Sequence, residues 1–271
     1  MGDASLFLGQ HTLIMGILNV TPDSFSDGGR YLDASQALAH AQILIEGGAD
    51  ILDIGGESSR PGSDPVSLEE ELRRVVPVVR SLASACGIPL SIDTTKPEVA
   101  ERCLDLGARI VNDIGGMRDP KMIRVTAHHG ASAVIMHMRG TPKTMQQEPA
   151  YVDVVSQVKQ FLVERVDAAK QAGVLDIAID PGIGFGKTAA HNFEILRRLD
   201  EFQSVRCPVL VGPSRKSFLA FPKGQPEESN RLEGTLAAAV IAAMKGATVI
   251  RVHDVAACRR ALQVADAVRQ Q

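Results

Sequence analysis

The sequence predicts a single-domain α/β protein with the fold of a (β/α)8 barrel, or TIM barrel. Apolar runs and amphipathic stretches alternate eight times along the 271 residues, always in the same order. Each repeat takes roughly 30 residues, as a strand and its crossover helix do, and such barrels take about 250 residues as one unit. No linker, low-complexity tract or charge block divides the chain, so we expect one domain over residues 1–271.

The eight predicted strands are short and rich in Val and Ile, which is typical of strands buried on both faces. They are residues 12–18, 50–56, 89–93, 109–113, 132–138, 176–182, 208–214 and 248–254. An open doubly wound sheet would show the same alternation, but no GxGxxG follows the first run, and eight repeats favour a closed barrel. Residues 1–11 precede the first strand, and we expect a short extension or hairpin that covers the barrel floor.

Helix signals lie between these runs. Ser67 with Glu70, and Thr95 with Glu98, have the spacing of a capping box at the start of a helix. Glycines stand where helices should end before the next strand, at Gly47, Gly107, Gly173 and Gly246.

Composition narrows the functional class. The 29 Lys+Arg and 32 Asp+Glu residues give a net charge of -3, which leaves no electrostatic signature of nucleic-acid binding. The four cysteines lie far apart and show no metal-binding or CxxC spacing, so we expect reduced, structural thiols. No signal peptide opens the chain, and the longest apolar stretch, 236–244, is too short to span a bilayer. We expect a cytoplasmic protein without a membrane or nucleic-acid partner.

Polar residues end nearly every predicted strand. In this fold the carboxyl ends of the strands carry the active site. A single polar strand end usually reflects only contact with solvent, but acids, amides and bases repeated around a ring favour a site. These residues are Asn19, Asp53, Asp93, Asn112, His137, Asp180, Ser214, Lys216, Arg251 and His253.

The last predicted strand suggests an anion site. Arg251 and His253 are two residues apart, so their side chains point to the same face. With Lys216 they would form a cationic cluster suited to a phosphate or pyrophosphate. The alternative is that His253 only forms hydrogen bonds within the core.

Carboxylates and an amide should stand opposite that cluster. Asp93, Asn112 and Asp180 offer acceptors for the N–H groups of a flat, nitrogen-rich heterocycle. The sequence therefore predicts a ligand with a polar heterocycle at one end and a phosphate at the other.

Two long loops follow the first two strands, at 20–33 and 57–66. Long loops at this end of a barrel are often lids. Arg60 in the second loop could close over an anion.

Two other features look functional at first sight. Residues 181–188 resemble a phosphate-binding P-loop, but Pro181 replaces the first glycine, and the segment follows the sixth strand rather than the first. His128 and His129 should lie at the end of a helix, where histidines contact terminal carbonyls more often than they bind a metal.

Eight segments, in order along almost the entire chain, resemble the dihydropteroate synthase family. They are MGILNVTPDSFSDGG (15–29), DIGGESSRPG (53–62), SIDTTKP (91–97), NDIGG (112–116), MHMRGTPKTMQ (136–146), DPGIGFGKT (180–188), SRKSFL (214–219) and RVHDV (251–255). The resemblance implies the barrel fold and a transferase reaction of folate biosynthesis. In that reaction the amine of p-aminobenzoate displaces pyrophosphate from 6-hydroxymethyl-7,8-dihydropterin pyrophosphate, with Mg2+ as cofactor.

The resemblance also implies site residues. Those expected to hold the pterin are Asp93, Asn112, Asp180 and Lys216, beside Gly184 and Phe185. Those expected to hold the pyrophosphate are Asn19, Arg251 and His253, with Asn19 also a magnesium ligand. Those expected around p-aminobenzoate are Phe25, Ser59, Arg60, Pro61, Ser214 and Lys216. Catalysis is expected to depend on Asp93, Lys216, Arg251 and His253.

Further expectations follow from the same resemblance. The family is usually a homodimer and is a sulfonamide target, although Ser59 stands where the family usually has Thr. Two rival functions remain. One is a methyltetrahydrofolate–corrinoid methyltransferase, which handles no pyrophosphate, and the other is a non-catalytic pterin-binding paralogue, in which a broken anion pocket or shortened loops are expected.

Overall fold

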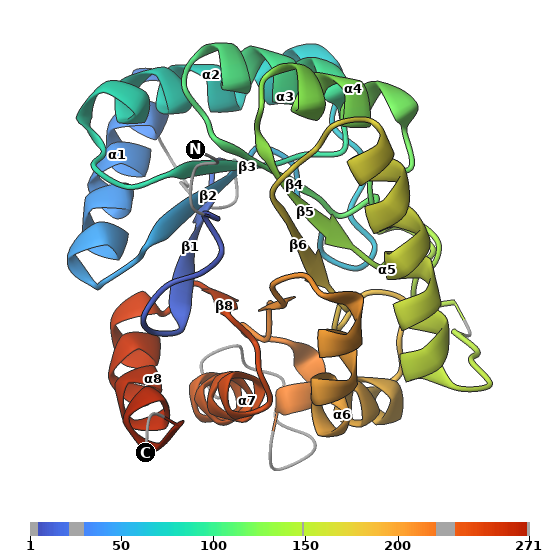
Figure 1. Cartoon of the computed structure of the whole chain (residues 1–271). Helices are drawn as coiled ribbons and strands as arrows, with labels where there is room; N and C mark the ends of the chain where they lie inside the picture. Colours follow the sequence, from blue (N-terminus) through green and yellow to red (C-terminus); the bar gives the residue numbers. More distant parts are fainter. Residues whose placement is uncertain (1–4, 22–29, 148, 221–230, 270–271) are drawn as a thin grey trace.

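Eight parallel strands form the centre of the molecule and eight helices surround them (Figure 1). The structure is a computed structural model that describes residues 5–21, 30–147, 149–220 and 231–269. The strands are β1 (Leu13–Asn19), β2 (Ile51–Gly55), β3 (Leu90–Asp93), β4 (Ile110–Asp113), β5 (Ser132–Met136), β6 (Ile177–Asp180), β7 (Leu210–Val211) and β8 (Val249–Val252). The helices are α1 (Arg30–Glu46), α2 (Leu68–Ala85), α3 (Pro97–Asp105), α4 (Pro120–His128), α5 (Val154–Gln171), α6 (Ala189–Arg197), α7 (Leu232–Met244) and α8 (Val255–Arg269).

The strand order shows that the sheet closes on itself. Each strand pairs in parallel with its neighbour in sequence, and β1 also pairs with β8. The join between β6 and β7 is the weakest, with a bridge of Ile179 to Val209 and a 2.9 Å bond from the Ile179 N–H to the Pro208 carbonyl. The predicted barrel is therefore confirmed and the open doubly wound sheet is wrong.

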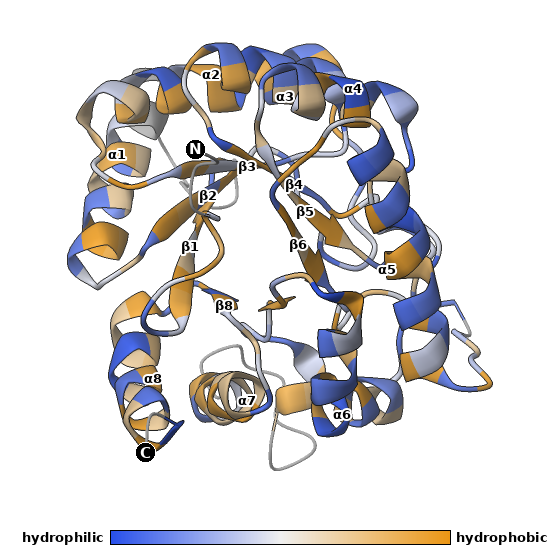
Figure 2. Cartoon of the chain, in the orientation of Figure 1, coloured by the Kyte–Doolittle hydropathy of each residue, from blue (hydrophilic) through white to orange (hydrophobic). Residues whose placement is uncertain are grey.

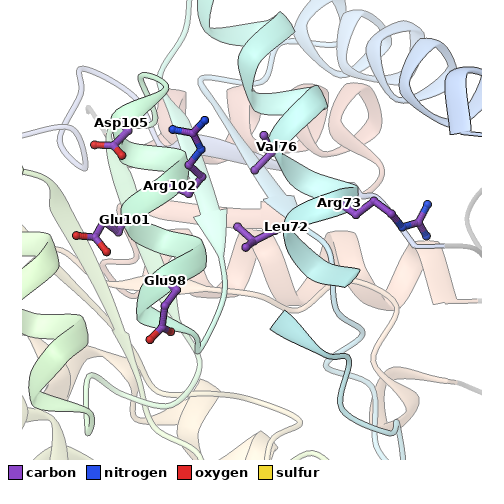
Figure 3. A pocket seen from close by; sticks show the side chains of 7 residues that line it. All are labelled: Leu72, Arg73, Val76, Glu98, Glu101, Arg102 and Asp105. Carbon is purple, nitrogen blue, oxygen red and sulfur yellow. The ribbon is translucent and has the colours of Figure 1, made fainter. Parts of the chain in front are cut away.

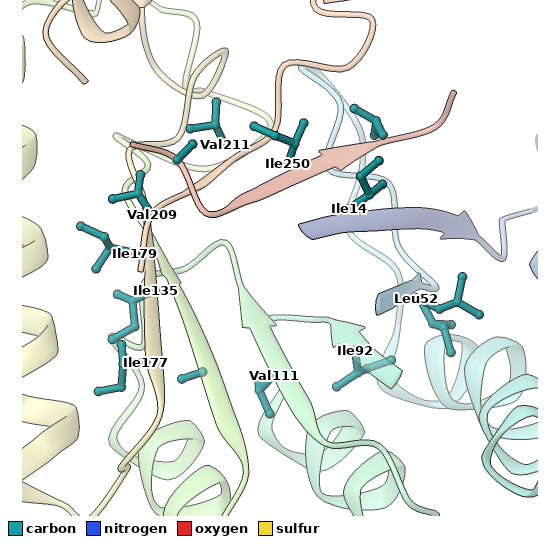
Figure 4. Close-up of a cluster of buried hydrophobic side chains, with 14 of the residues drawn as sticks. Ile14, Leu52, Ile92, Val111, Ile135, Ile177, Ile179, Val209, Val211 and Ile250 are labelled. Carbon is teal, nitrogen blue, oxygen red and sulfur yellow. The ribbon is translucent and has the colours of Figure 1, made fainter. Parts of the chain in front are cut away.

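Side chains alternate between the two faces of every strand, because successive residues of a strand point to opposite sides. The outward side chains pack beneath the helices and include Ile14, Leu52, Ile92, Val111 and Ile250 (Figure 4). The strands are mainly apolar, whereas most of the helices contain both polar and apolar residues (Figure 2).

The inward side chains fill the barrel in layers, as in other barrels of this type. The lower layers are apolar and form one cluster with Phe7: Leu13, Met15, Ile51, Ile110, Val134, Ala178, Leu210 and Val249. The layer above is polar. The alternation of side chains thus places the polar strand ends on the inner face.

The N-terminal segment closes the floor of the barrel. Phe7 is fully buried against the apolar layer, and Ser5 and Leu6 are bonded to the carboxylate of Asp176. Residues 5–12 contain turns and no strand, so within the described part of the chain the segment is an extension rather than a hairpin.

The predicted helix starts were partly right. Ser67 caps α2 by accepting the Glu70 N–H at 3.2 Å, but α3 begins at Pro97, and its N-cap residue is Lys96 rather than Thr95. A proline is favoured at the first position of a helix, since its missing N–H would have no partner there. No helix within the described residues is both long and apolar enough to cross a membrane.

Candidate active site

The inward polar layer at the carboxyl ends of the strands brings most of the predicted site residues together. Six of them lie within one residue of the carboxyl end of a strand of the ring: Asn19, Asp93, Asn112, Asp180, Arg251 and His253. Four more lie in the segments that follow β6 and β7: Gly184, Phe185, Ser214 and Lys216. Phe25 lies outside the described residues. Ser59, Arg60 and Pro61 lie on the loop after β2, where Ser59 is half-buried and the other two are exposed.

Arg251 lies between two carboxylates. Its Nε donates to Asp53 Oδ2 at 2.6 Å and its Nη2 donates to Asp93 Oδ2 at 2.7 Å. Asp53 Oδ2 also accepts the side-chain N–H of Asn112 at 2.9 Å. The sequence predicted that Asp93, Asn112 and Asp180 stand opposite the cationic cluster, whereas Asp93 is bonded directly to Arg251. Part of the guanidinium is already paired, and only its remaining N–H groups are left for an anion.

The charges in this cluster perturb one another. Burial raises the pKa of Asp93 to about 7, in spite of Arg251, and the neighbouring carboxylate of Asp53 adds to the shift. Burial works against the charge of Arg251, but Asp53 and Asp93 raise its pKa above the ordinary value. Arg251 is thus charged at neutral pH, while Asp93 is poised between its two protonation states.

Asp180 and Lys216 form the second part of the site. Asp180 is buried, and its Oδ1 accepts the Gly182 N–H at 2.7 Å. Burial raises the pKa of Asp180 to about 6, and burial together with Arg251 lowers the pKa of Lys216 to about 8. An acceptor and a donor therefore face the same space without being fixed in an ion pair.

Gly184 and Phe185 lie directly against Lys216. The Lys216 ammonium lies 4.0 Å from the centre of the Phe185 ring, which is the geometry of a cation–π contact. A Cβ atom on Gly184 would lie 2.8 Å from Lys216 Cδ, so a larger residue would displace the lysine. These three residues therefore pack closely together at the carboxyl ends of β6 and β7.

His253 forms a separate polar group with Ser214 and Asn19. Its Nδ1 lies 2.9 Å from Ser214 Oγ, and its Nε2 lies 3.5 Å from Asn19 Nδ2. The imidazole thus lies between the two side chains, and the backbone N–H of His253 also donates to Ser214 Oγ at 3.1 Å.

The imidazole of His253 is neutral in the free protein. Burial, followed by the charges of Arg251 and Arg215, lowers its pKa to about 3. The prediction of a cluster of three cations was therefore wrong for this residue. His253 contributes a hydrogen bond to the site rather than a charge.

A strained turn carries Ser214 and Lys216. Arg215, between them, has a φ of 55°, which is uncommon for a residue other than glycine. The Arg215 N–H is accepted by Thr235 Oγ1 at 3.0 Å, and its guanidinium pairs with Asp254 at 2.8 Å. The surrounding contacts hold a strained conformation, which is common where a binding site is preorganised. Neither Arg215 nor Asp254 was singled out from the sequence.

The base of the loop at 57–66 is fixed by an ion triad. Lys96 pairs with Glu57 and, at 2.5 Å, with Glu71, which is almost fully buried. Glu57 also accepts the Val66 N–H at 3.3 Å, which draws the two ends of the loop together. The loop that carries Ser59 and Arg60 thus has an anchored base and an exposed tip.

The segment that resembles a P-loop does not present its lysine to a phosphate. Lys187 is 2% exposed, and its ammonium is surrounded by carbonyl groups inside the molecule. His129, the other feature set aside, contacts the Val125 carbonyl at 3.0 Å near the end of α4, as expected.

The site offers few protein ligands for a magnesium ion. In the described residues no group of three or more His, Cys, Asp or Glu side chains could hold a metal. Mg2+ is often bound through one or two protein oxygens and the phosphates of a substrate. The amide oxygen of Asn19 fits that pattern, because its amide nitrogen is the atom that faces His253.

A groove on the outside of the barrel lies between α2 and α3 and has a volume of about 520 Å3 (Figure 3). Leu72 and Val76 form its apolar part, but its carboxylates already have partners, as in the pairs Glu98–Lys121 and Asp105–His129. We therefore place the active site at the strand ends and not in this groove.

Comparisons with known proteins show which family the chain resembles. Residues 15–253 match the family described as pterin binding enzyme. A dihydropteroate synthase of Synechocystis is 47% identical over 263 residues, which cover 96% of this chain and 91% of that protein. A structure of the Xanthomonas albilineans dihydropteroate synthase with 4-aminobenzoic acid has a TM-score of 0.90 and 45% identity, and covers 96% of this chain and 94% of that chain. The Clostridium difficile enzyme, in the presence of pteroic acid, has a TM-score of 0.91 and 42% identity, and covers 100% of both chains.

Proposed function

The chain belongs to the dihydropteroate synthases within the pterin binding enzyme family, and from this premise we propose how its residues carry out the reaction. The substrates are 6-hydroxymethyl-7,8-dihydropterin pyrophosphate and p-aminobenzoate, and the products are 7,8-dihydropteroate and pyrophosphate. One observation carries the assignment of roles. Acceptors for a heterocycle and donors for an anion share the inward face of one ring of strands.

The pterin binds between Asp180, Asn112 and Lys216 in this proposal. The free oxygen of Asp180 accepts N–H groups of the aminopyrimidine edge, while Phe185 and the Lys216 stem cover a ring face. Asn112 is held by Asp53, so its amide oxygen keeps a fixed direction. Asp93, beside Arg251, is the further acceptor.

The pyrophosphate binds at the other end, near Arg251, His253 and Asn19. Donors fixed before the reaction stabilise charge as it develops on a leaving group, because they need not reorganise. Arg251 supplies the N–H groups that the carboxylates leave unused, and Ser214 adds a hydroxyl. Mg2+, held by Asn19 and the substrate, would supply further charge neutralisation on the leaving group.

The reaction breaks the C–O bond to pyrophosphate and forms a C–N bond to the arylamine, which then loses a proton. The dihydropterin ring delocalises the positive charge of the methylene group, so early loss of pyrophosphate is favoured. The nearby carboxylates of Asp93 and Asp180 stabilise that cation. The arylamine then needs placement more than activation, and no protein base has to be assigned.

The p-aminobenzoate site is formed by the loop at 57–66 together with Ser214 and Lys216. Arg60 is near enough to His253 to contribute, after burial and closer arginines, to the low pKa of that imidazole. Its guanidinium can therefore reach an anion bound beside His253. Closure of this loop would also exclude water from the cationic intermediate.

The two rival functions explain the site less well. A corrinoid methyltransferase would not need donors for a pyrophosphate, and a non-catalytic paralogue should have lost part of the anion pocket. Arg251, His253, Ser214 and Asn19 are all present and in contact with one another or with buried partners.

The test is an assay of pyrophosphate release with and without p-aminobenzoate and Mg2+. We expect release only when both are present, together with formation of dihydropteroate. Lys216→Met should abolish product formation, while Lys121→Met, on the outside of α4, should not. Binding of the pterin substrate without any release of pyrophosphate would identify the non-catalytic paralogue instead.

We also propose a cytoplasmic homodimer. Large apolar side chains are exposed on three neighbouring helices, α6, α7 and α8: Phe193, Ile241, Met244, Val264 and Val268. An apolar surface of this kind often marks a protein interface. Equilibrium sedimentation should give twice the chain mass of 28.9 kDa, and a monomer at micromolar concentration would contradict the proposal.

A further inference from the structure

Lys187 is a buried amine that the proposed chemistry does not use. Its Nζ lies within hydrogen-bond distance of four acceptors. These are the carbonyls of Gly182 at 2.9 Å, Phe185 at 3.0 Å and His137 at 3.3 Å, and the His137 ring nitrogen Nδ1 at 3.0 Å. Two of the four belong to the loop that contains Lys187 itself, and two belong to the residue after β5.

The shape of the loop depends on glycines. Gly182, Gly184 and Gly186 have φ values of 67°, 84° and 63°, in the region that other residues rarely adopt. A Cβ on Gly182 would lie 1.9 Å from the His137 carbonyl oxygen, and one on Gly186 would lie 2.6 Å from the Arg139 carbonyl oxygen. The loop is therefore packed tightly against the end of β5, and its backbone carbonyls are turned toward Lys187.

This loop carries two elements of the pterin subsite. The Gly182 N–H is bonded to Asp180, while the Gly182 carbonyl is bonded to Lys187. The Phe185 carbonyl is also bonded to Lys187, while the Phe185 ring lies beneath Lys216. Each of these two residues thus links Lys187 on one side to a predicted pterin contact on the other.

The electrostatic environment explains why a lysine stands here. Three carbonyl dipoles and an imidazole lone pair converge, and an unpaired buried acceptor is costly. Burial lowers the pKa of Lys187 to about 7, and the carboxylate of Asp180 opposes that shift. Burial also lowers the pKa of His137 to about 2, so its ring is neutral and its Nδ1 can accept a hydrogen bond from the Lys187 ammonium.

Other side chains hold the opposite edge of the loop. Tyr151 donates to the Gly186 carbonyl at 2.8 Å, and Gln146 donates to the Gly184 carbonyl at 3.0 Å. Asn192 accepts the Gly184 N–H at 2.8 Å. None of these bonds involves the carbonyl groups that Lys187 holds, so its role is not duplicated.

We propose that Lys187 is a positioning residue for the pterin subsite, which sets the distance between the Asp180 carboxylate and the Phe185 ring by binding the carbonyls of Gly182 and Phe185. This inference rests on the proposed function, because it takes the ligand of that space to be a pterin. Lys187 does not contact the substrate. Its removal should weaken binding of the pterin ring and leave unchanged the anion subsite, which Asn19 of β1, Arg251 of β8 and His253 form.

The test compares Lys187→Met, which keeps the chain length and removes the donor, with Lys121→Met on the outside of α4. Calorimetry measures the affinity for 6-hydroxymethylpterin, which lacks the pyrophosphate, and separately for pyrophosphate with Mg2+. We expect Lys187→Met to weaken pterin binding by about tenfold or more, because displacement of the loop would cost the pterin its charged hydrogen bond to Asp180, and to change pyrophosphate binding less than about twofold. In steady-state kinetics the KM for the pterin substrate should rise while the KM for p-aminobenzoate stays constant.

An unchanged pterin affinity in folded Lys187→Met would overturn the inference, and so would equal losses for both ligands. Failure of the wild-type protein to bind the pterin at all would refute the proposed function instead. If Lys187→Met does not fold, Tyr151→Phe perturbs the same loop from its other edge. That variant should weaken pterin binding by about threefold without affecting pyrophosphate, and a wild-type pterin affinity would count against control of the site by this loop.

Discussion

The Nε of Arg251 donates to Oδ2 of Asp53 over 2.6 Å, in a layer of the barrel where Asp53 is fully buried. The two residues are 198 positions apart in sequence and meet on the inner face, on strands β8 and β2. Among the described residues, Asp53 Oδ1 has no hydrogen-bond partner. The carboxylate of Asp53 and the guanidinium of Arg251 therefore stabilise each other inside the barrel. Substitution of either residue should lower the free energy of unfolding.

Asp53→Asn should destabilise the fold, because it removes one of the two carboxylates that balance the buried guanidinium of Arg251. Breaking a buried ion pair from one side typically costs about 3 kcal/mol of unfolding free energy. Urea denaturation measures this difference. Asp64→Asn, in an exposed pair with Lys143, is the control and should leave the unfolding curve unchanged. Equal midpoints for the two variants would show that the Asp53–Arg251 pair contributes nothing.

Asp180→Asn should weaken pterin binding and, at the same time, stabilise the fold at high pH. The pterin loses a charged hydrogen bond, worth roughly 1.5–3 kcal/mol. Burial raises the pKa of Asp180 from 3.8 to about 6, so ionisation of this carboxyl lowers the free energy of unfolding. Below the pKa of the unfolded state the carboxyl is neutral in both states. The destabilisation develops as the pH rises from there through the folded pKa of about 6.

The stability of the Asp180→Asn variant relative to the wild type should therefore increase between about pH 4 and about pH 7 and reach about 1 to 3 kcal/mol. Denaturation curves across this range check the sign, and calorimetry with 6-hydroxymethylpterin checks the binding. A gain in stability without loss of pterin affinity would remove Asp180 from the pterin subsite.

His253→Ala should weaken the binding of pyrophosphate about tenfold and leave that of a pterin without pyrophosphate unchanged. Since the pKa of His253 is lowered to about 3, the ring acts as a neutral hydrogen-bonding group. The ratio of wild-type to variant affinity should thus stay constant from about pH 6 to about pH 8. A ratio that falls as the pH rises would show instead that a protonated imidazole binds the anion. His129→Ala, near the end of α4, is the matched control.

Lys96→Met should weaken p-aminobenzoate binding about fivefold, because it releases the base of the loop at 57–66 from Glu57 and Glu71. The titration is made with Mg2+ and pyrophosphate present, since we expect p-aminobenzoate to bind well only after the anion has ordered the loops. Lys143→Met removes an exposed ion pair with Asp64 of the same loop and should weaken p-aminobenzoate binding less. Equal affinity for p-aminobenzoate in the wild type with and without pyrophosphate would refute the ordered scheme.

The strands could be predicted from sequence because their apolar runs are local signals. The predicted ranges extend beyond the observed strands by one or two residues, and most at 208–214, where only Leu210–Val211 form β7. The prediction that Arg251 and His253 point to the same face also followed from the period of two along a strand.

Other features depend on neighbours that are distant in sequence. The pairing of Arg251 with Asp53 depends on how far each strand is shifted along its neighbours, which no local pattern contains. The neutral state of His253 comes from burial, and the inward direction of Lys187 comes from its position after a turn of glycines. A capping box at Thr188 with His191 also went unrecognised, since histidine is not the usual partner there.

The join between β6 and β7 divides the pterin contacts between two sides of the ring. Asp180 ends β6 on one side and Lys216 follows β7 on the other, while in the described residues the two strands are connected by the bridge of Ile179 to Val209, which includes the bond from the Ile179 N–H to the Pro208 carbonyl. A ligand that contacts both sides therefore connects β6 and β7 where the barrel has the fewest hydrogen bonds between strands. Ligand binding should therefore oppose local opening of the barrel between these strands. The amide protons of Leu210 and Val211 should exchange with solvent more slowly when the ligand is bound than when it is absent.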